Sequence, residues 1–223
     1  MGAIHRGVPP ELCAILQRLT RAATFVETGT NKGNTALWAA ERFDRVWTIE
    51  AHDGQYARAR ARLAPVKNID VVHGESHVAL QAFMAKLQAP AVCWLDAHWS
   101  GAGTAGESYQ CPVIDEIRAV DCSAIEHVIL IDDARMFMRP YALPYDVAHW
   151  PALPALFDVL RQRWTDASIV VVDDVIVRVP GRIRDAFIEA VRVLPDTAQA
   201  LATRSQRWRP LRLLQKKLGG RAT

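Results

Sequence analysis

The sequence predicts an α/β protein with a mostly parallel sheet of seven strands, one of them antiparallel, and helices on both faces. Short, nearly continuous apolar segments alternate with helical patterns, which is typical of parallel strands buried on both sides. The last two strand-like segments, 168–172 and 175–179, are separated only by Asp173 and Asp174. So short a connection permits only an antiparallel hairpin, so one strand must run against the others.

The first part of the chain is predicted to form a leading helix and a strand–loop–helix–strand unit. Apolar residues recur at helical spacing over residues 11–21, after two prolines suited to a helix start. A β-rich strand follows over 24–27, then a glycine turn, a helix over 34–43 and a strand over 45–49. The second strand ends on an acid, Glu50.

The middle of the chain repeats the alternation of helix and strand. We expect a helix over 53–64, which Pro65 ends, and a strand over 69–72. Ser76 is a candidate cap for a helix over 76–87. The remaining elements expected up to Asp133 are a strand over 91–95, a loop of small residues over 97–110, a helix over 111–120 and a strand over 127–131.

The last part is predicted to begin with a long loop that carries several aromatic residues, over 134–152. A helix over 153–164 leads into the hairpin, and a helix over 183–194 packs after it. Residues 1–203 are therefore expected to form a single domain, followed by a basic tail over 204–223.

The glycine turn between the first strand and its helix is the strongest motif. It reads G-T-N-K-G, one glycine short of the dinucleotide-binding G-x-G-x-x-G pattern. Lys32 precedes Gly33 instead of following it, so the turn also departs from a P-loop. A glycine turn in some other α/β protein remains the alternative interpretation.

The segment over residues 27–35 resembles the first motif of class I S-adenosylmethionine-dependent methyltransferases, E-x-G-T-x-x-G-x-[ST]. It stands here as Glu27, Gly29, Thr30, Gly33 and Thr35. The resemblance implies a Rossmann-like fold and S-adenosylmethionine as the cofactor. It covers most of residues 24–179.

Further cofactor contacts are expected where other strands end, because ligands of open α/β sheets bind outside the carboxyl ends of the strands. Glu50 is well placed to accept hydrogen bonds from ribose hydroxyls. The turn formed by Gly74, Glu75 and Ser76 resembles the segment of the family that contacts adenine. Asp96, after the fourth strand, completes the predicted cofactor site.

Three acids at neighbouring strand ends predict a divalent cation. The carboxylates of Asp96, Asp132 and Asp133 would repel one another unless a cation or a proton intervened, and Mg²⁺ prefers such oxygen ligands. These positions match the metal ligands of the cation-dependent O-methyltransferases, and the sequence looks closest to their macrocin-type group. That group methylates sugar hydroxyls of natural products. The alternative is that Asp132 and Asp133 only cap the following turn.

His98 is the candidate catalytic base, because histidine titrates near neutral pH and follows Asp96 closely. Catechol-type relatives have a lysine where Trp99 stands here, so the resemblance excludes the lysine mechanism. The alternative is a loop histidine with a structural bond. Aromatic residues of the two long loops are expected to stack on the acceptor, namely Trp99, Tyr109, Phe137, Tyr141 and Tyr145.

Composition limits the possible partners. The net charge is only +3 and the basic residues gather in the tail, so the body is slightly acidic, and we expect no nucleic-acid partner. Four cysteines without C-x-x-C pairing indicate free thiols and a cytoplasmic protein. The tail is expected to pack on the domain or in a homodimer rather than on a membrane.

Together these observations predict an S-adenosylmethionine-dependent O-methyltransferase that acts on a hydroxyl of a small molecule, a sugar or natural product, with a divalent cation. Two alternatives stay open. A metal-dependent hydrolase could use Asp96, His98, Asp132 and Asp133, although it leaves the glycine turn and Glu50 unexplained. A cofactor-binding module without catalysis is the other.

Overall fold

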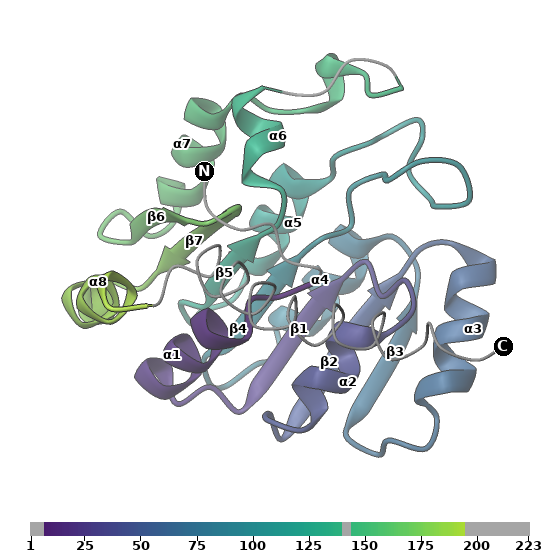
Figure 1. Cartoon of the computed structure of the whole chain (residues 1–223), viewed down its shortest axis with the longest axis horizontal. Coiled ribbons are helices and arrows are strands. Elements are labelled where there is room, and N and C mark those ends of the chain that lie inside the picture. Colours follow the sequence, from purple (N-terminus) through teal and green to yellow (C-terminus); the bar gives the residue numbers. More distant parts are fainter. Residues whose placement is uncertain (1–6, 140–143, 195–223) are drawn as a thin grey trace, which may run out of the picture.

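The computed structural model describes residues 7–139 and 144–194 and contains one seven-stranded sheet in the order β3-β2-β1-β4-β5-β7-β6 (Figure 1). The strands are β1 (Thr24–Thr28), β2 (Arg45–Glu50), β3 (Ile69–His73), β4 (Ala91–Leu95), β5 (Val128–Ile131), β6 (Ser168–Val172) and β7 (Val175–Val179). The α-helices are α1 (Pro10–Thr20), α2 (Asn34–Ala40), α3 (Asp53–Leu63), α4 (Ser76–Met84), α5 (Val113–Val120), α6 (Ala134–Met138), α7 (Leu153–Gln162) and α8 (Arg184–Arg192). Two short 3-10 helices are η1 (Val147–His149) and η2 (Gly181–Ile183).

The sheet separates two hydrophobic cores, because side chains alternate between its faces along each strand. Phe25, Val92 and Val128 pack on one face with α1, α2, α3 and α8, and α1 and α8 lie side by side there (Figure 1). Val26 and Cys93 belong to the opposite core with α4, α5, α6 and α7. The prediction of strands covered on both faces is confirmed.

The register brings the functional segments to one edge of the sheet. Strands β1 to β5 pair in parallel, so their carboxyl ends lie together at this edge. Strand β7 runs antiparallel to both β5 and β6, as the short hairpin predicts. Its residue Ile176 pairs with Ile131 at the end of β5, so the turn at Asp173 and Asp174 lies at the same edge.

Three local predictions need correction. The long loop predicted over 134–152 contains α6 and η1. Ser76 does not cap α4; Glu75 occupies the cap position, and Ser76 is the first helical residue with its side chain buried. Helix α2 ends at Ala40, so Phe43 packs in the core from beyond the helix.

The basic tail over 204–223 and Tyr141 lie outside the described residues.

A buried ion pair joins β7 to the end of α5. The side chain of Arg178 is 0% exposed, and its Nη1 and Nη2 atoms donate to the two carboxylate oxygens of Asp121, each at 2.7 Å. Nη1 also donates to the carbonyl oxygen of Leu160 at 3.3 Å. The guanidinium charge is thus compensated inside the protein, where solvent cannot screen it.

The described helices are all too short or too polar to cross a bilayer, so within residues 7–139 and 144–194 no membrane-spanning helix is found.

Candidate functional site

A pocket of about 450 Å³ opens at the carboxyl edge of the sheet, a volume suited to a small-molecule ligand. Six residues predicted for the cofactor or for catalysis line it, namely Gly29, Glu50, Glu75, Ser76, Asp96 and His98. They come from the ends of β1, β2, β3 and β4, as the rule for open α/β sheets requires.

The glycine turn lies directly against the end of β4. Gly29 has φ +80°, and a Cβ atom built on it would lie 2.3 Å from the carbonyl oxygen of Asp96. The backbone N–H groups of Gly29 and Thr30 donate to the carbonyl oxygen of Ile49, at 2.9 and 3.2 Å. Glycine is therefore required at residue 29 both by its backbone conformation and by the close approach of a second backbone.

Glu50 holds two backbone segments around the pocket. Its Oε2 accepts from the N–H of Asn31 at 2.8 Å, and its Oε1 accepts from the N–H of His52 at 3.0 Å. The residue is only 7% exposed, yet it lines the pocket. Each carboxylate oxygen can accept a further hydrogen bond, so the two oxygens remain available to a ligand hydroxyl.

Replacing Glu50 by alanine is expected to weaken binding of S-adenosylhomocysteine (SAH) about tenfold or more. The change removes charge-assisted hydrogen bonds worth about 1.5–3 kcal/mol. Calorimetry with the two proteins measures the effect, and Glu41→Gln, at an exposed carboxylate directly after α2, is the control. An SAH affinity within about twofold of the unaltered protein would contradict the ribose role.

Five predicted cofactor residues do not line the pocket, namely Glu27, Thr30, Gly33, Thr35 and Gly74. Glu27 is buried below the turn, where its Oε2 accepts from the Thr48 hydroxyl at 2.6 Å, and Thr30 Oγ1 lies 2.6 Å from Thr48 Oγ1. Burial raises the pKa of Glu27 to about 8, although bonds from Thr48 and Thr35 oppose the shift. Gly33 caps α2 with φ 74°.

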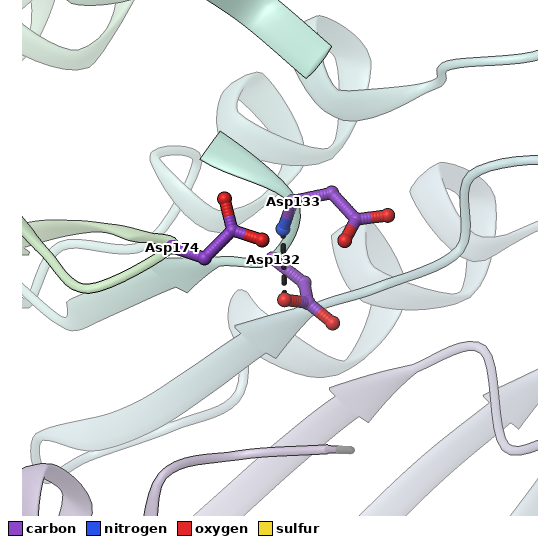
Figure 2. A group of neighbouring side chains, drawn as sticks. All are labelled: Asp132, Asp133 and Asp174. Carbon is purple, nitrogen blue, oxygen red and sulfur yellow. Dashed lines mark hydrogen bonds between the residues drawn. The ribbon is translucent and has the colours of Figure 1, made fainter. Parts of the chain in front are cut away.

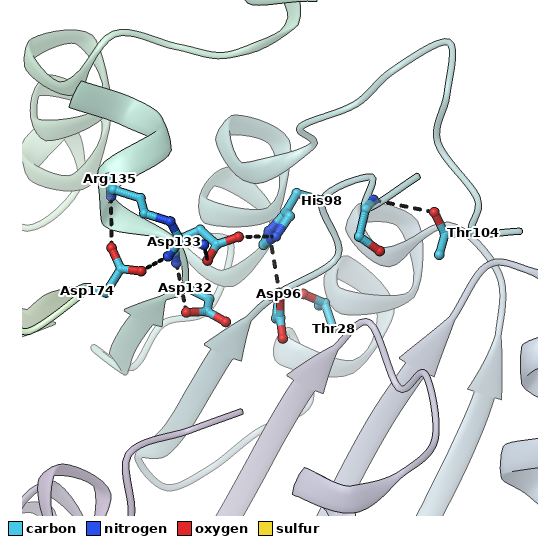
Figure 3. Close-up of polar contacts among 9 residues, drawn as sticks. Thr28, Asp96, His98, Thr104, Asp132, Asp133, Arg135 and Asp174 are labelled. Atoms are coloured by element: carbon cyan, nitrogen blue, oxygen red, sulfur yellow. Dashed lines mark hydrogen bonds and ion pairs between the residues drawn. The ribbon is translucent and has the colours of Figure 1, made fainter. Parts of the chain in front are cut away.

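A chain of alternating charges runs beside the pocket at the ends of β4, β5 and the final hairpin (Figure 3). His98 Nε2 lies 2.8 Å from Asp133 Oδ2, and His98 Nδ1 lies 3.7 Å from Asp96 Oδ1. Arg135 contacts Asp133 at 2.7 Å and also pairs with Asp174. His98 and Arg135 therefore both compensate Asp133, and Arg135 links it to the hairpin.

These contacts shift the pKa values of His98, Asp133 and Asp132. Burial disfavours the charged imidazolium, but the bond to Asp133 and the charges of Asp96, Asp133 and Asp132 raise the pKa of His98 to about 9. Burial also opposes ionisation of Asp133, but His98 and Arg135 outweigh it and hold its pKa below the usual range. Burial and the charges of Asp96 and Asp133 raise the pKa of Asp132 to about 8.

The carboxylates of Asp132, Asp133 and Asp174 gather at the end of β5 (Figure 2). One ligand oxygen from each lies within 4.8 Å of the others, and Asp132 Oδ1 accepts from the N–H of Asp133 at 2.8 Å. Oxygen donors at this spacing suit a hard divalent cation. The raised pKa of Asp132 supports this fit, because an added positive charge would relieve the repulsion.

The structure thus brings two of the three predicted metal ligands together and adds Asp174, which was not predicted. Asp96 is not in this group of three; its side chain faces His98. The sequence rule considers only residues that follow a parallel strand, and Asp174 instead comes directly before β7. The antiparallel direction of β7, which the sequence does predict, places the hairpin turn beside Asp132.

The aromatic residues expected to contact an acceptor are mostly buried instead. Trp99 is 5% and Phe137 is 3% exposed, and both belong to a packed aromatic cluster with Tyr145 and Trp150. Tyr109, in contrast, is 42% exposed and lines the pocket. The expectation of an aromatic acceptor pocket is therefore wrong for Trp99 and Phe137, and Tyr109 fits it.

No protein-family model and no curated protein matches the chain. Its structure is similar to that of the methyltransferase PaMTH1 from Podospora anserina, bound to SAH, with TM-score 0.52 and 14% identity over 76% of this chain and 75% of that one. It is also similar to an O-methyltransferase from Bacillus cereus in complex with SAH, with TM-score 0.53 and 16% identity over 77% and 80% of the two chains. These likenesses show a shared fold, so the chain has the Rossmann-like fold of class I methyltransferases.

Proposed function

We propose that this protein is an S-adenosylmethionine-dependent O-methyltransferase. The observation that supports it best is the junction of Gly29 with the Asp96 backbone, beside the carboxylate of Glu50, at the pocket. The glycine turn and the Asp96 backbone thereby form part of the wall of a pocket at the carboxyl edge of the sheet, where open α/β folds bind nucleotides. The similar structures from P. anserina and B. cereus both hold SAH, and the second is an O-methyltransferase.

In this proposal the pocket residues hold the cofactor in a fixed orientation. Glu50 accepts hydrogen bonds from the ribose, while Gly29 lets the ligand approach the backbone. Glu75 and Ser76, which line the pocket, are proposed to contact the adenine. Glu27, Thr30, Gly33 and Thr35 support the turn from below. The cofactor, when bound, supplies an electrophilic methyl group on its sulfonium sulfur.

The acceptor is proposed to be a hydroxyl of a small molecule, a sugar or natural product, bound beside His98. Asp132 and Asp133 are the proposed ligands of a divalent cation, with Asp174 as an additional donor. Asp96, the third predicted ligand, lies outside this group and faces His98. Such a cation, when bound, makes a hydroxyl easier to deprotonate. Tyr109 and the small residues around it line the pocket and are proposed to contact the acceptor.

His98 is the group proposed to take the acceptor proton. Asp96 and Asp133 lie on either side of the imidazole and would stabilise the imidazolium that forms. Because its pKa is raised to about 9, the imidazole of His98 is protonated on both nitrogens at pH 7, and its Nε2 faces Asp133. It must release one of these two protons before it can act as a base.

The cofactor is tested first, by calorimetry of the full chain with SAH. Binding is expected with and without Mg²⁺, because Asp132, Asp133 and Asp174 do not line the pocket. A chain that binds no SAH would contradict the proposal, and the hydrolase interpretation would then be the one to assay. SAH binding without methyl transfer to any hydroxyl compound would instead favour a module without catalysis.

Replacing Asp132 by asparagine is expected to reduce methyl transfer about a hundredfold or more, because it removes a charged ligand of the proposed cation. SAH affinity is expected to stay unchanged. Asp158→Asn, at an exposed residue of α7, is the matched control. Full activity of the unaltered protein in excess EDTA would favour the interpretation that Asp132 and Asp133 only cap the turn.

A further inference from the structure

A second cavity adjoins the cofactor pocket and has no part in the chemistry described so far. Its volume is about 490 Å³, and it lies between the glycine turn and α3. Asn31 and Gln55 line both this cavity and the pocket, so the two are neighbours. The other lining residues are Lys32, Arg58, Ala59 and Arg62. All the ionisable side chains of this lining are cations, and we call it the basic cavity.

The cations of the basic cavity come from its two opposite walls. Arg58 and Arg62 are one helical turn apart on α3 and share a face with Gln55, while Lys32 belongs to the glycine turn. Two like charges at this helical spacing repel each other and disfavour the helix. A bound anion would relieve this repulsion, because an opposite charge nearby favours the charged form of each group.

The positive charges of the basic cavity are not compensated within the described residues. Neither Lys32 nor Arg58 has an ion pair in residues 7–139 and 144–194. Arg62 is held in place, because its Nη1 atom donates to the carbonyl oxygen of Lys32 and, at 2.8 Å, to Asn34 Oδ1. Both acceptors are neutral, so they fix the guanidinium without cancelling its charge. Other exposed arginines do pair with an aspartate, namely Arg45, Arg118 and Arg184.

The charge of the basic cavity also stands out against the rest of the domain. The seven basic residues of 204–223 exceed the net charge of +3, so residues 1–203 carry a net negative charge. Three cations around one cavity are therefore not a sample of a generally basic surface. They suit a compact anion with several charges, and arginine in particular matches the geometry of phosphate oxygens.

The neighbouring carboxylate indicates which molecule carries the anion. Glu50 lines the cofactor pocket, and its Oε2 accepts from the N–H of Asn31 at 2.8 Å. A carboxylate binds hydroxyls but repels phosphate, so a phosphate on the ribose of the nucleoside would be disfavoured there. The anion therefore belongs to a separate ligand, and the cavity is large enough for a small molecule.

We propose that the basic cavity binds the phosphate group of a small molecule, beside the cofactor and at the same time. Lys32, Arg58 and Arg62 are the groups that contact the phosphate oxygens. This inference does not rest on the proposed function, because the cations and the cavity are the same whatever the neighbouring pocket holds.

Pyrophosphate is the probe that tests the proposal. Calorimetry of the full chain at constant ionic strength measures its affinity, so that screening is equal in every titration. Arg58→Gln is expected to weaken binding about tenfold or more, because it removes charge-assisted hydrogen bonds. Arg60→Gln is the matched control, since Arg60 is exposed on α3 but does not line the cavity. Lys32→Gln provides a second variant from the opposite wall, with the same expected loss.

Three results would overturn the proposal. One is a full chain that binds no pyrophosphate, and another is an equal loss of affinity in Arg58→Gln and Arg60→Gln, which would indicate only a general attraction to α3. The third is competition, in which SAH displaces pyrophosphate from the unaltered protein. Adenosine diphosphate and glucose 6-phosphate, titrated with SAH present, distinguish a nucleotide from a sugar phosphate by which of them loses affinity in Arg58→Gln. A chain that binds pyrophosphate through Arg58 but binds no SAH would contradict the proposed function alone.

Discussion

Replacing Gly29 by alanine is expected to abolish SAH binding and to lower the stability of the protein. The new Cβ atom would lie 2.3 Å from the Asp96 carbonyl oxygen, 2.9 Å from its carbonyl carbon and 3.2 Å from the Ala97 Cα. All three are backbone atoms, so no side-chain rotation can relieve the contact. The turn must move away from β4, and the pocket between them changes shape. Calorimetry with SAH and thermal unfolding measure the two effects.

Gly103→Ala is the matched control for this substitution. Gly103 has φ +88°, close to the +80° of Gly29, but a Cβ atom there meets nothing within 4 Å. Both variants therefore carry a similar conformational strain of about 1–2 kcal/mol, and only Gly29→Ala adds the clash. SAH affinities that are equal in the two variants would show that the close approach to Asp96 does not shape the cofactor site.

Replacing Asp121 by alanine is expected to cost about 3–5 kcal/mol of the free energy of unfolding. The substitution leaves the guanidinium of Arg178, which is 0% exposed, without its carboxylate partner. The hydrogen bond to the Leu160 carbonyl remains, but a carbonyl does not neutralise a charge. Urea unfolding of both proteins measures the loss.

Two further variants separate burial from ion pairing as such. Asp70→Ala removes the ion pair between Arg45 and Asp70, whose side chains are 53% and 51% exposed, together with a hydrogen bond from Trp47 Nε1, and is expected to cost at most about 2 kcal/mol. Asp121→Ala combined with Arg178→Met is expected to recover part of the loss, because no buried charge is then left unpaired. An Asp121→Ala protein as stable as Asp70→Ala would contradict this account of the buried pair.

The fold could be predicted because short segments of the sequence determine the type and the direction of the strands. Strand β4 reads as an unbroken apolar run, and all five of its residues are buried. The pair Asp173 and Asp174 leaves room only for a hairpin, which fixed the one antiparallel strand. Helix ends could be predicted less well. The apolar pattern continues to Phe43, but α2 ends at Ala40 and Phe43 reaches the core from outside the helix. The pattern shows that a residue is buried, not that it is helical.

The site was predicted in part, for a reason that lies in the topology. Residues directly after parallel strands, such as Glu50 and Asp96, could be assigned to one edge from the sequence alone. Asp174 could not be found by the same rule, because it reaches the site from a hairpin. The loop aromatics were misjudged, since sequence does not distinguish a ring that lines a pocket from one such as Phe137 that packs in the core.

The position of β7 determines when this sheet can close during synthesis on the ribosome. Strand β7 lies between β5 and β6, although it is the last strand of the sheet to be made. Until residues 175–179 have emerged, β5 has an unpaired edge of apolar residues, which is the kind of edge that associates with other chains. The growing chain must therefore carry this edge from the synthesis of Ile131 until that of Val179, and it gains the last acid of the site, Asp174, within the same interval.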